Sequence, residues 1–278
     1  MPEIAYLNGE MLPIEQAKVP VEDRGYQFGD AVYEYLTTYG GKIFALEAHL
    51  DRLYNSLNAL GFPSISRDRI REAITGTHRQ SGIDPAGIYL QISRGVVPRN
   101  HPFPDKSEPQ IVVIVRHLPE IEPKLRETGI RAITVNDIRW GRCDIKTVQL
   151  LANSMAKQQA LDARADDAIF ISDDGIVREA TSSNVFIVTN GTLRTHPLTP
   201  NILPGITRAE LIKLAKVHDI PTFEAFFPKS ELLAADEVFL SGTVTEVLPV
   251  TQIDDQTVGN GKPGPISRNL YKWLLEET

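Results

Sequence analysis

Short strand-like segments alternate with amphipathic helix-like segments throughout this chain, and glycine-containing turns join several of the strands. AYLNGEML and YEYLTTYGGKIFAL carry Asn8-Gly9 and Gly40-Gly41, residue pairs that suit two-residue β-hairpin turns. Apolar residues at positions 46, 50, 53, 57 and 60 have the spacing of one helix face, and Gly61 is expected to end that helix. A second helix is predicted over Arg67 to Ser81, before the strand-like segments GIYLQISRG and PQIVVIVRHL. The pattern predicts a mixed α+β fold.

The length of 278 residues allows two domains of ordinary size. The segment LPEIEPK, residues 118–124, contains prolines and charges but few apolar residues, which is typical of an interdomain linker. We therefore predict a smaller N-terminal α+β domain over residues 1–117 and a larger C-terminal α+β domain over residues 125–278. A small-molecule site is expected in the cleft between two such domains.

The second domain is expected to begin with a strand over Ile130 to Val135, followed by a helix from Val148 to about Ala163. Strand-like AIFISDD and VREATSSNVFIVTNGTLRTHP come next, with turns at Asp173-Asp174-Gly175 and Asn190-Gly191. TRAELIKLAKVHD has the apolar spacing of a helix, and EVFLSGTVTEVLPVTQID is typical of strand, loop and strand.

Composition and charge exclude several classes of function. The net charge of −7 comes without any basic block, which argues against nucleic acid as a partner. The single cysteine, Cys143, excludes an internal disulfide, and the six histidines show no metal-ligand spacing near it, so no metal site is predicted. The Cys143 thiol is one candidate for a catalytic nucleophile. The N-terminal MPEIAYLNGE does not resemble a signal peptide, and no stretch approaches the roughly 18 apolar residues of a membrane span. A soluble cytoplasmic protein is expected.

Lys146 lies in DIRWGRCDIKTVQLL, between the expected strand and the expected helix. A lysine just inside a core-forming segment is costly to bury as a cation, and a neutral amine there is a nucleophile that can form a Schiff base. Further along, VREATSSNVF places Glu179 before a run of hydroxyls and an amide. An amine that attacks an aldehyde and a carboxylate that keeps a pyridine nitrogen protonated are the groups that pyridoxal phosphate chemistry needs. The alternative is that Lys146 is a surface lysine at the start of a helix.

LPGITRAEL predicts an anion site at the start of a helix. Gly205 permits a close backbone approach, and Thr207 with Glu210 three residues later has the spacing of a capping box. The free N–H groups of Ile206 and Thr207 would then face a phosphate, favoured by the helix dipole. An ordinary helix start is the alternative interpretation.

Three further sites carry chemistry that suits anions. The loop SGTVTEV offers Thr243 as a phosphate ligand, or is only a turn. Arg52 lies beside the apolar face of its expected helix, where an arginine either extends along the surface or reaches a phosphate. PRNHPFP places Arg99 and His101 two residues apart, so on an extended loop both side chains point the same way and suit a substrate carboxylate. A solvated proline-rich loop is the alternative there.

Seven segments carry a resemblance to a known family: DRGYQFGDAVYEYL, EAHLDRLYNSL, SRGVVPRNHPFP, DIRWGRCDIK, REATSSNVF, LPGITR and SGTVTEV. Their order and spacing resemble the fold-type IV pyridoxal-phosphate aminotransferases over nearly the whole sequence, and most of all the D-amino acid aminotransferases. The resemblance implies a two-domain α+β fold with the active site in the interdomain cleft. It also implies that Lys146 is the Schiff-base lysine, which moves the α-proton, and that Glu179 contacts the pyridine nitrogen.

The same resemblance assigns the remaining site residues. Arg52, the backbone of Ile206 and Thr207, and Thr243 are expected to bind the cofactor phosphate. Arg99, His101 and Tyr33 are expected to bind the substrate carboxylate; in the family the Arg-x-His pair reaches the site from the other subunit of a homodimer. The implied activity is transfer of an amino group from a D-amino acid of the D-alanine type to a 2-oxo acid such as 2-oxoglutarate.

Alternatives within the family are a branched-chain L-amino acid aminotransferase and an aminodeoxychorismate lyase. The former usually carry Phe-Glu-Gly-x-Arg where this chain has VYEYL, and the latter usually lack Arg-x-His, so both motifs favour the D-amino acid enzymes. An alternative from another class is a non-catalytic phosphate- or nucleotide-binding protein that uses LPGITR. Gly242 falls where relatives often have a hydroxyl, which implies one fewer phosphate contact, and Tyr35 is expected to narrow the substrate site.

Overall fold

A computed structural model describes residues 3–278, in which the chain divides into two compact units. The first unit extends to Pro119 and includes the later segment Ile145–Gln149. The second unit contains Glu120–Asp144 and Leu150–Thr278. The last two residues of the expected linker are already helical, because α4 covers Pro123–Thr128.

The first unit is built on a six-stranded antiparallel sheet with the strand order β2-β1-β6-β5-β3-β4. Both predicted hairpins are confirmed: Asn8 and Gly9 have φ angles of 53° and 117°, and Gly40 and Gly41 have 54° and 77°. These positive angles are the ones that asparagine and glycine tolerate in tight turns. The strands are β1 (Ile4–Leu7), β2 (Glu10–Pro13), β3 (Ala31–Tyr39), β4 (Lys42–Ile43), β5 (Ala86–Ser93) and β6 (Gln110–His117).

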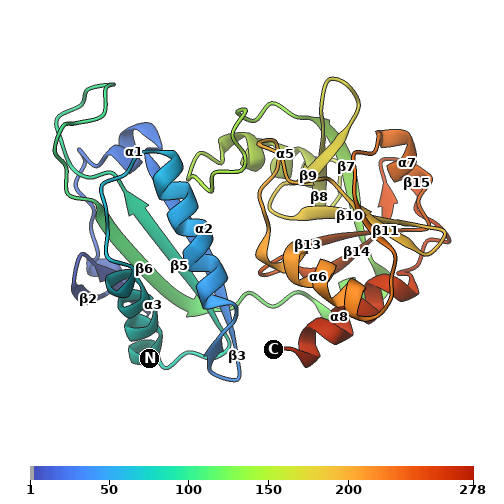
Figure 1. Ribbon diagram of the computed structural model, residues 1–278, viewed down its shortest axis with the longest axis horizontal. Coiled ribbons are helices and arrows are strands. Elements are labelled where there is room, and N and C mark those ends of the chain that lie inside the picture. The colour runs from blue at the N-terminus through green and yellow to red at the C-terminus, as the bar shows by residue number, and fades with distance from the viewer. Residues whose placement is uncertain (1–2) are drawn as a thin grey trace. The chain divides into compact units, whose positions relative to one another are not determined.

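Two helices, α2 (Leu46–Ala59) and α3 (Arg67–Ser81), cover one face of this sheet (Figure 1). Their predicted positions are confirmed, and Gly61 follows α2 with φ 61°. Apolar side chains from both helices and from the facing sides of β3, β5 and β6 form the core of the unit. A short 3-10 helix (Ile14–Gln16) and α1 (Arg24–Phe28) precede β3.

The helix expected from Val148 begins only at Leu151, so that prediction is wrong at its start; α5 covers Leu151–Asp162. Residues 146–148 instead pair with the beginning of β3, where Tyr33 N donates to Lys146 O at 3.0 Å and Val148 N donates to Ala31 O at 3.2 Å. These backbone hydrogen bonds hold the segment extended. Lys146 therefore lies in an extended segment at the sheet edge and not at the start of a helix.

The second unit contains a nine-stranded mixed sheet with the order β12-β11-β10-β13-β14-β7-β8-β9, and β15 pairs with β14. Strand β9 also pairs with β10. Six strands, in the order β10-β13-β14-β7-β8-β9, therefore form a closed ring. The pairing that closes the ring places Asn184 opposite Glu179. The strands are β7 (Ile130–Asn136), β8 (Asp167–Ile171), β9 (Val177–Ala180), β10 (Asn184–Thr189), β11 (Thr192–Thr195), β12 (Thr222–Glu224), β13 (Glu237–Gly242), β14 (Glu246–Ile253) and β15 (Gln256–Thr257).

Helices pack against different strands of this sheet. Helix α5 packs on β7 and β8, whereas α6 (Ile206–Val217) and α8 (Pro265–Glu276) pack on each other and on β13 (Figure 1). The short α7 (Lys229–Leu233) contributes Leu232 to the core. The predicted turn at Asn190-Gly191 is confirmed, with φ angles of 50° and 75°. Both units mix helices and sheets, so the α+β prediction is confirmed. Among residues 3–278, no helix is long and apolar enough to cross a bilayer.

Candidate active site

Glu179 of β9 is a buried carboxylate with donors on both of its oxygens. Its Oε1 accepts a hydrogen bond in an ion pair from Arg139. Its Oε2 accepts from Asn184 Nδ2 at 3.1 Å and from Leu203 N at 3.0 Å. These contacts fix the orientation of the carboxylate, because rotation would break hydrogen bonds that water cannot replace at a buried position.

Arg139 is a functional candidate that the sequence reasoning missed. Its Nε and Nη2 bind the carboxylate of Asp137 at 2.9 and 2.8 Å, and its guanidinium lies 4.3 Å from the ring centroid of Phe170. Burial opposes the charge of Arg139, but Asp137 and Glu179 outweigh that effect and raise its pKa above the ordinary value. The available signal was its position in DIRWGRCDIK, two residues after an aspartate.

Asn184 links Glu179 to the start of helix α6. Besides Glu179, its Nδ2 contacts Leu203 O at 3.0 Å. A Cβ atom at Gly205 would lie 2.1 Å from Asn184 Oδ1, so only glycine permits this approach. The first turn of α6 is thereby packed against a residue that holds the carboxylate.

The predicted capping box at Thr207 is wrong. The N-cap of α6 is Gly205, no side chain caps the helix, and Glu210 instead pairs with Lys213 at 2.7 Å. Thr207 is the second helical residue, which is too far along the helix to act as the N-cap. The N–H groups of Ile206 and Thr207 nevertheless have no partner within the helix, so the helix start retains the donors and the dipole that bind an anion.

Hydroxyl groups gather at the β13–β14 turn, which contains Thr243. Ser183 Oγ and Thr245 Oγ1 are 3.1 Å apart. A Cβ atom at Gly242 would lie 3.3 Å from Ser183 Oγ, so this pair occupies the space beside the glycine. Within the described residues, Ser241 Oγ is buried without a hydrogen-bond partner.

The register of the sheet places this unpartnered hydroxyl near the carboxylate. Ser241 lies opposite Asn184, and Asn184 lies opposite Glu179, so the three side chains share one face. A buried polar atom without a partner is costly unless a bound group completes it. The carboxylate, the helix start and the hydroxyl turn thus fit the ring nitrogen and phosphate of pyridoxal phosphate.

Lys146 is half-buried in the first unit, between the buried Ile145 and Thr147. Its backbone N donates to Ser56 Oγ of α2 at 3.2 Å, and its Nζ lies 4.1 Å from the centroid of the Tyr33 ring. Tyr33 comes from β3, and its ring is 5.7 Å from that of Tyr89. The structure therefore brings together the predicted amine and one predicted substrate-binding residue.

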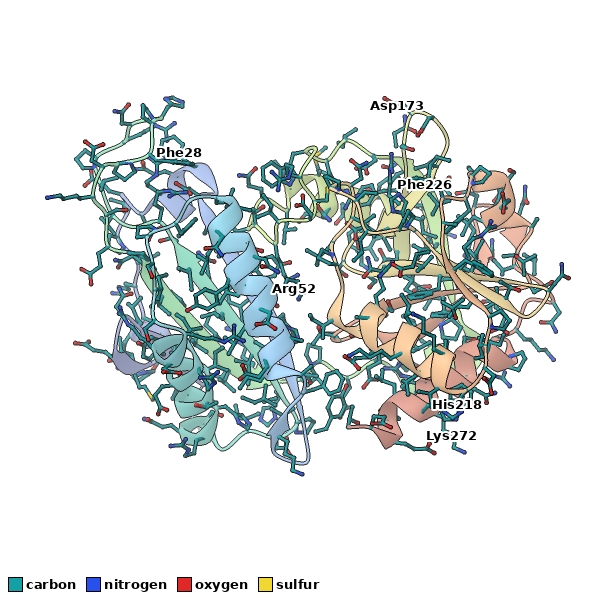
Figure 2. The ribbon with its side chains drawn as sticks, viewed as in Figure 1. Phe28, Arg52, Asp173, His218, Phe226 and Lys272 are labelled. Atoms are coloured by element: carbon teal, nitrogen blue, oxygen red, sulfur yellow. The ribbon has the colours of Figure 1, made fainter. Side chains whose placement is uncertain are left out.

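Arg52 is buried on α2 (Figure 2), which excludes the interpretation of a surface-lying arginine. Its Nε and Nη2 bind the two oxygens of Glu34 at 2.8 and 2.7 Å, and His49 Nδ1 lies 2.8 Å from Glu34 Oε2. Burial raises the pKa of Glu34, but Arg52 and His49 outweigh burial and lower it to about 2. Burial lowers the pKa of His49. Sequence reasoning missed Glu34 and His49, although a glutamate inside the apolar strand VYEYL is a signal of pairing.

Arg99 and His101 lie on the exposed connection between β5 and β6. The expectation of an extended loop is wrong, since the chain bends at residues 98, 99, 101 and 102. Both side chains nevertheless contact the same ring: the Arg99 guanidinium is 4.3 Å from the centroid of Phe28, and the His101 ring is 5.6 Å from it. Phe28, the last residue of α1, thus organises the predicted carboxylate-binding pair.

The structure argues against the alternative of a catalytic thiol. Cys143 Sγ donates to Trp140 O at 3.2 Å, and burial raises the pKa of the thiol to about 11. A thiol with this pKa is protonated near neutral pH and is a poor nucleophile. In the described part of the chain, no group of three or more His, Cys, Asp or Glu side chains has the geometry of a metal site.

Comparison with known proteins identifies the family. Residues 31–253 match the family described as amino-transferase class IV. The chain belongs to this family. It is 42% identical to the D-alanine aminotransferase of Bacillus licheniformis, a match that covers 98% of this chain and 97% of that protein. It is 41% identical to the D-alanine aminotransferase of Listeria monocytogenes, covering 98% and 94%.

Solved structures confirm the fold-type IV architecture. The branched-chain amino acid aminotransferase of Escherichia coli superposes with a TM-score of 0.92 at 28% identity, covering 99% of this chain and 94% of that chain. The branched-chain aminotransferase of Thermoproteus uzoniensis superposes with a TM-score of 0.88 at 27% identity, covering 98% and 93%. The family predicted from the seven sequence segments is therefore confirmed.

Proposed function

We propose that this protein is a pyridoxal-phosphate-dependent aminotransferase that moves an amino group from a D-amino acid such as D-alanine to a 2-oxo acid such as 2-oxoglutarate. The observation that carries the proposal is the 42% identity to a D-alanine aminotransferase over 98% of the chain. The residues that the reaction needs support it, because each has chemistry and surroundings suited to its role.

Glu179, Thr243 and the first turn of α6 would hold the cofactor, together with Arg52 and Lys146. When bound, pyridoxal phosphate supplies an electron sink for the electron pair left at the substrate Cα. Glu179 would keep a proton on the ring nitrogen through its fixed negative charge. The N–H groups of Ile206 and Thr207 would donate hydrogen bonds to the phosphate, and Arg52 would add a charged donor.

Lys146 has two roles in this proposal. Its Nζ would hold the cofactor, and as a free amine it would accept the proton from the substrate Cα and donate it to the cofactor carbon on the other side of the transferred nitrogen. The ring of Tyr33, 4.1 Å from Nζ, limits the positions that the amine can take. A positioned amine transfers a proton faster than a mobile one because less orientational freedom is lost on reaction.

We infer that Arg99, His101 and Tyr33 bind the α-carboxylate, and that the protein is a homodimer in which each Arg99-x-His101 loop serves the neighbouring subunit. The exposure of both loop side chains on their own chain supports this inference. A guanidinium fork and an imidazole suit a carboxylate, and the side of the site on which they hold it determines whether the D- or the L-enantiomer presents its α-proton to Lys146.

A branched-chain L-amino acid aminotransferase is the second candidate, because the superposition on the Escherichia coli enzyme of that name has a TM-score of 0.92. The sequence identity of 28% to that enzyme is lower than the identity to the D-alanine enzymes, which favours the first candidate. Initial rates with D-alanine and with L-leucine, each with 2-oxoglutarate as acceptor, separate the two. We expect D-alanine to be the better donor; a clear preference for L-leucine would establish the second candidate.

A further inference from the structure

Two buried arginines in the first unit share one carboxylate beside the Arg99-x-His101 loop. Arg24 Nε and Arg94 Nε both donate to Asp30 Oδ2 at 2.8 Å. The exposed fractions of Arg24, Asp30 and Arg94 are 2%, 8% and 2%. Since two buried cations face a single anion, the remaining donors of the arginines need other acceptors.

Those acceptors are backbone carbonyls, and for Arg24 all of them lie in the loop. Arg24 Nη1 donates to Asn100 O at 2.6 Å and, at 3.4 Å, to Pro102 O. Its Nη2 donates to His101 O at 3.3 Å. One guanidinium thus fixes three consecutive peptide carbonyls, which a compact ammonium group could not do from one position.

Arg94 anchors the same carboxylate to the end of helix α2. Its Nη1 donates to Gly61 O at 3.1 Å and its Nη2 donates to Leu60 O at 2.8 Å. Asp30 therefore connects Arg24, which binds the loop, to Arg94, which binds the C-terminal end of α2. The loop is tied to the rigid part of the unit, although it lies on the surface.

Aromatic rings extend this connection to the substrate-binding pair. The Arg94 guanidinium lies 3.6 Å from the centroid of Phe103, a residue of the loop itself. The Arg24 guanidinium lies 4.6 Å from the centroid of Phe28 (labelled in Figure 2), the ring that Arg99 and His101 also contact. The excess positive charge of Arg24 and Arg94 also favours an anion near the loop.

We propose that Arg24 is a positioning residue for substrate binding: with Asp30 and Arg94 it fixes the backbone of residues 100–102, so that Arg99 and His101 are held in place to receive the α-carboxylate. This rests on the proposed function, in which those two side chains bind substrate. Because the loop is preorganised, substrate binding does not have to order it, and the affinity for the carboxylate rises.

The substitution Arg24→Lys tests the proposal. Lysine keeps the positive charge beside Asp30 but cannot reach three carbonyls at once. We expect hydrogen exchange of the Val97 amide, which donates to Glu22 O at 3.4 Å where the loop begins, to accelerate by about 10-fold or more, because the hydrogen bonds that tie the loop to Arg24 are lost. The KM for D-alanine should rise by about 10-fold or more in the holoenzyme, while kcat at saturation and the absorbance of bound cofactor change little.

Two further variants make the test specific. Arg116→Lys alters an arginine whose side chain is 57% exposed and pairs with Glu3, and should change neither loop exchange nor KM. Phe103→Ala removes a ring that is 59% exposed, so the fold should survive it even if Arg24→Lys fails to fold. Loss of its contact with Arg94 should accelerate loop exchange and raise KM by several-fold.

The two readouts separate failure of this inference from failure of the proposed function. Unchanged loop exchange in both Arg24→Lys and Phe103→Ala would overturn the inference. Faster exchange with an unchanged KM would also overturn it, since the loop would then be mobile without consequence for substrate. A wild-type holoenzyme that does not use D-amino acids would overturn the proposed function, whatever the exchange rates show about the loop.

Discussion

Glu179 illustrates how this site is built at the scale of a single residue. One oxygen binds Arg139 and the other binds Asn184 and Leu203, so the carboxylate is held from two sides. A preorganised negative charge stabilises a proton on a nearby ring nitrogen without any rearrangement during the reaction. Arg139 is in turn held by Asp137, which keeps the guanidinium from rotating away.

We predict that Glu179→Gln leaves the cofactor attached to Lys146 but lowers turnover by about 100-fold, because a neutral amide no longer keeps the ring nitrogen protonated. Steady-state rates and the visible absorbance of the purified holoenzyme check this prediction. Glu231→Gln is a matched control, since the Glu231 side chain is 46% exposed and pairs with Arg194. Unchanged turnover of Glu179→Gln with full cofactor content would remove Glu179 from this role.

The sequence signals for individual residues differ in strength for physical reasons. Lys146 and Glu179 stand out because an amine or a carboxylate in a core-forming segment needs a partner or a function. Arg139 gives no such signal, since its role depends on a partner 40 residues away that only the folded sheet brings close. The sequence gives no signal for Ser241 either, because a serine in a strand is ordinary until its burial is known.

At the scale of elements, His196 connects β11 to the segment before α6. Its Nδ1–H donates to Pro197 O at 2.7 Å, and its Nε2 accepts from Arg178 Nη1 at 2.8 Å. Its ring also contacts Phe226, 5.0 Å away between centroids. Burial, with smaller contributions from the neighbouring arginines, lowers the pKa of His196 to about 4. The folded protein therefore holds this imidazole neutral.

Stability should fall as the pH is lowered from 6.5 towards 4, because the unfolded chain then binds a proton at His196 that the folded chain does not. The contribution of His196 to the free energy of unfolding is complete above pH 6.5 and is lost as the pH falls through its folded pKa of about 4. Buried His49 acts in the same direction. Urea midpoints measured from pH 7.5 to 5 check the prediction.

In His196→Gln the urea midpoint should depend less steeply on pH over this range. The reason is that a glutamine amide can accept from Arg178 and does not titrate. The remaining slope should come from His49. A wild-type midpoint that is constant or rises as the pH falls would contradict the assigned titration. Measurements below pH 4.5 are less specific, because carboxylates such as Glu34 begin to contribute there.

The elements that were predicted correctly depend on local chemistry, and those that were not depend on distant pairing. Asn8-Gly9 and Gly40-Gly41 specify hairpins through their own backbone preferences. Val148, by contrast, has helical surroundings in sequence but donates its N–H to Ala31 of β3. Thr207 has the spacing of a capping box, yet the close approach of Gly205 to Asn184 sets where α6 begins. Tertiary contacts overrule local propensity at both positions.

At the scale of the whole molecule, the proposed homodimer predicts complementation between defective subunits. Arg99→Ala and Lys146→Ala should each be nearly inactive with D-alanine as homodimers. A mixed dimer would contain one site with both an intact lysine and an intact arginine. After subunit exchange at equal concentrations, activity should return to about a quarter of the wild-type value, since about half of the dimers are mixed and each has one complete site.

Arg99→Ala exchanged with itself is the matched control and should show no recovery. Exchange has to be verified independently, for example with differently tagged subunits. If verified exchange restores no activity, Arg99 acts within its own subunit or at no site. The loop would then need a different role, although its attachment to Arg24 would be unaffected.

The central claim, that this chain transfers the amino group of D-amino acids, is tested most directly by a single-turnover half-reaction. Purified holoenzyme is mixed with D-alanine in the absence of any 2-oxo acid, and the visible absorbance of the cofactor and the pyruvate formed are followed together. We predict loss of the absorbance band with about one pyruvate formed per subunit, and a much slower change with L-leucine. A rapid change with L-leucine and none with D-alanine, or no change with either, would contradict the proposed function.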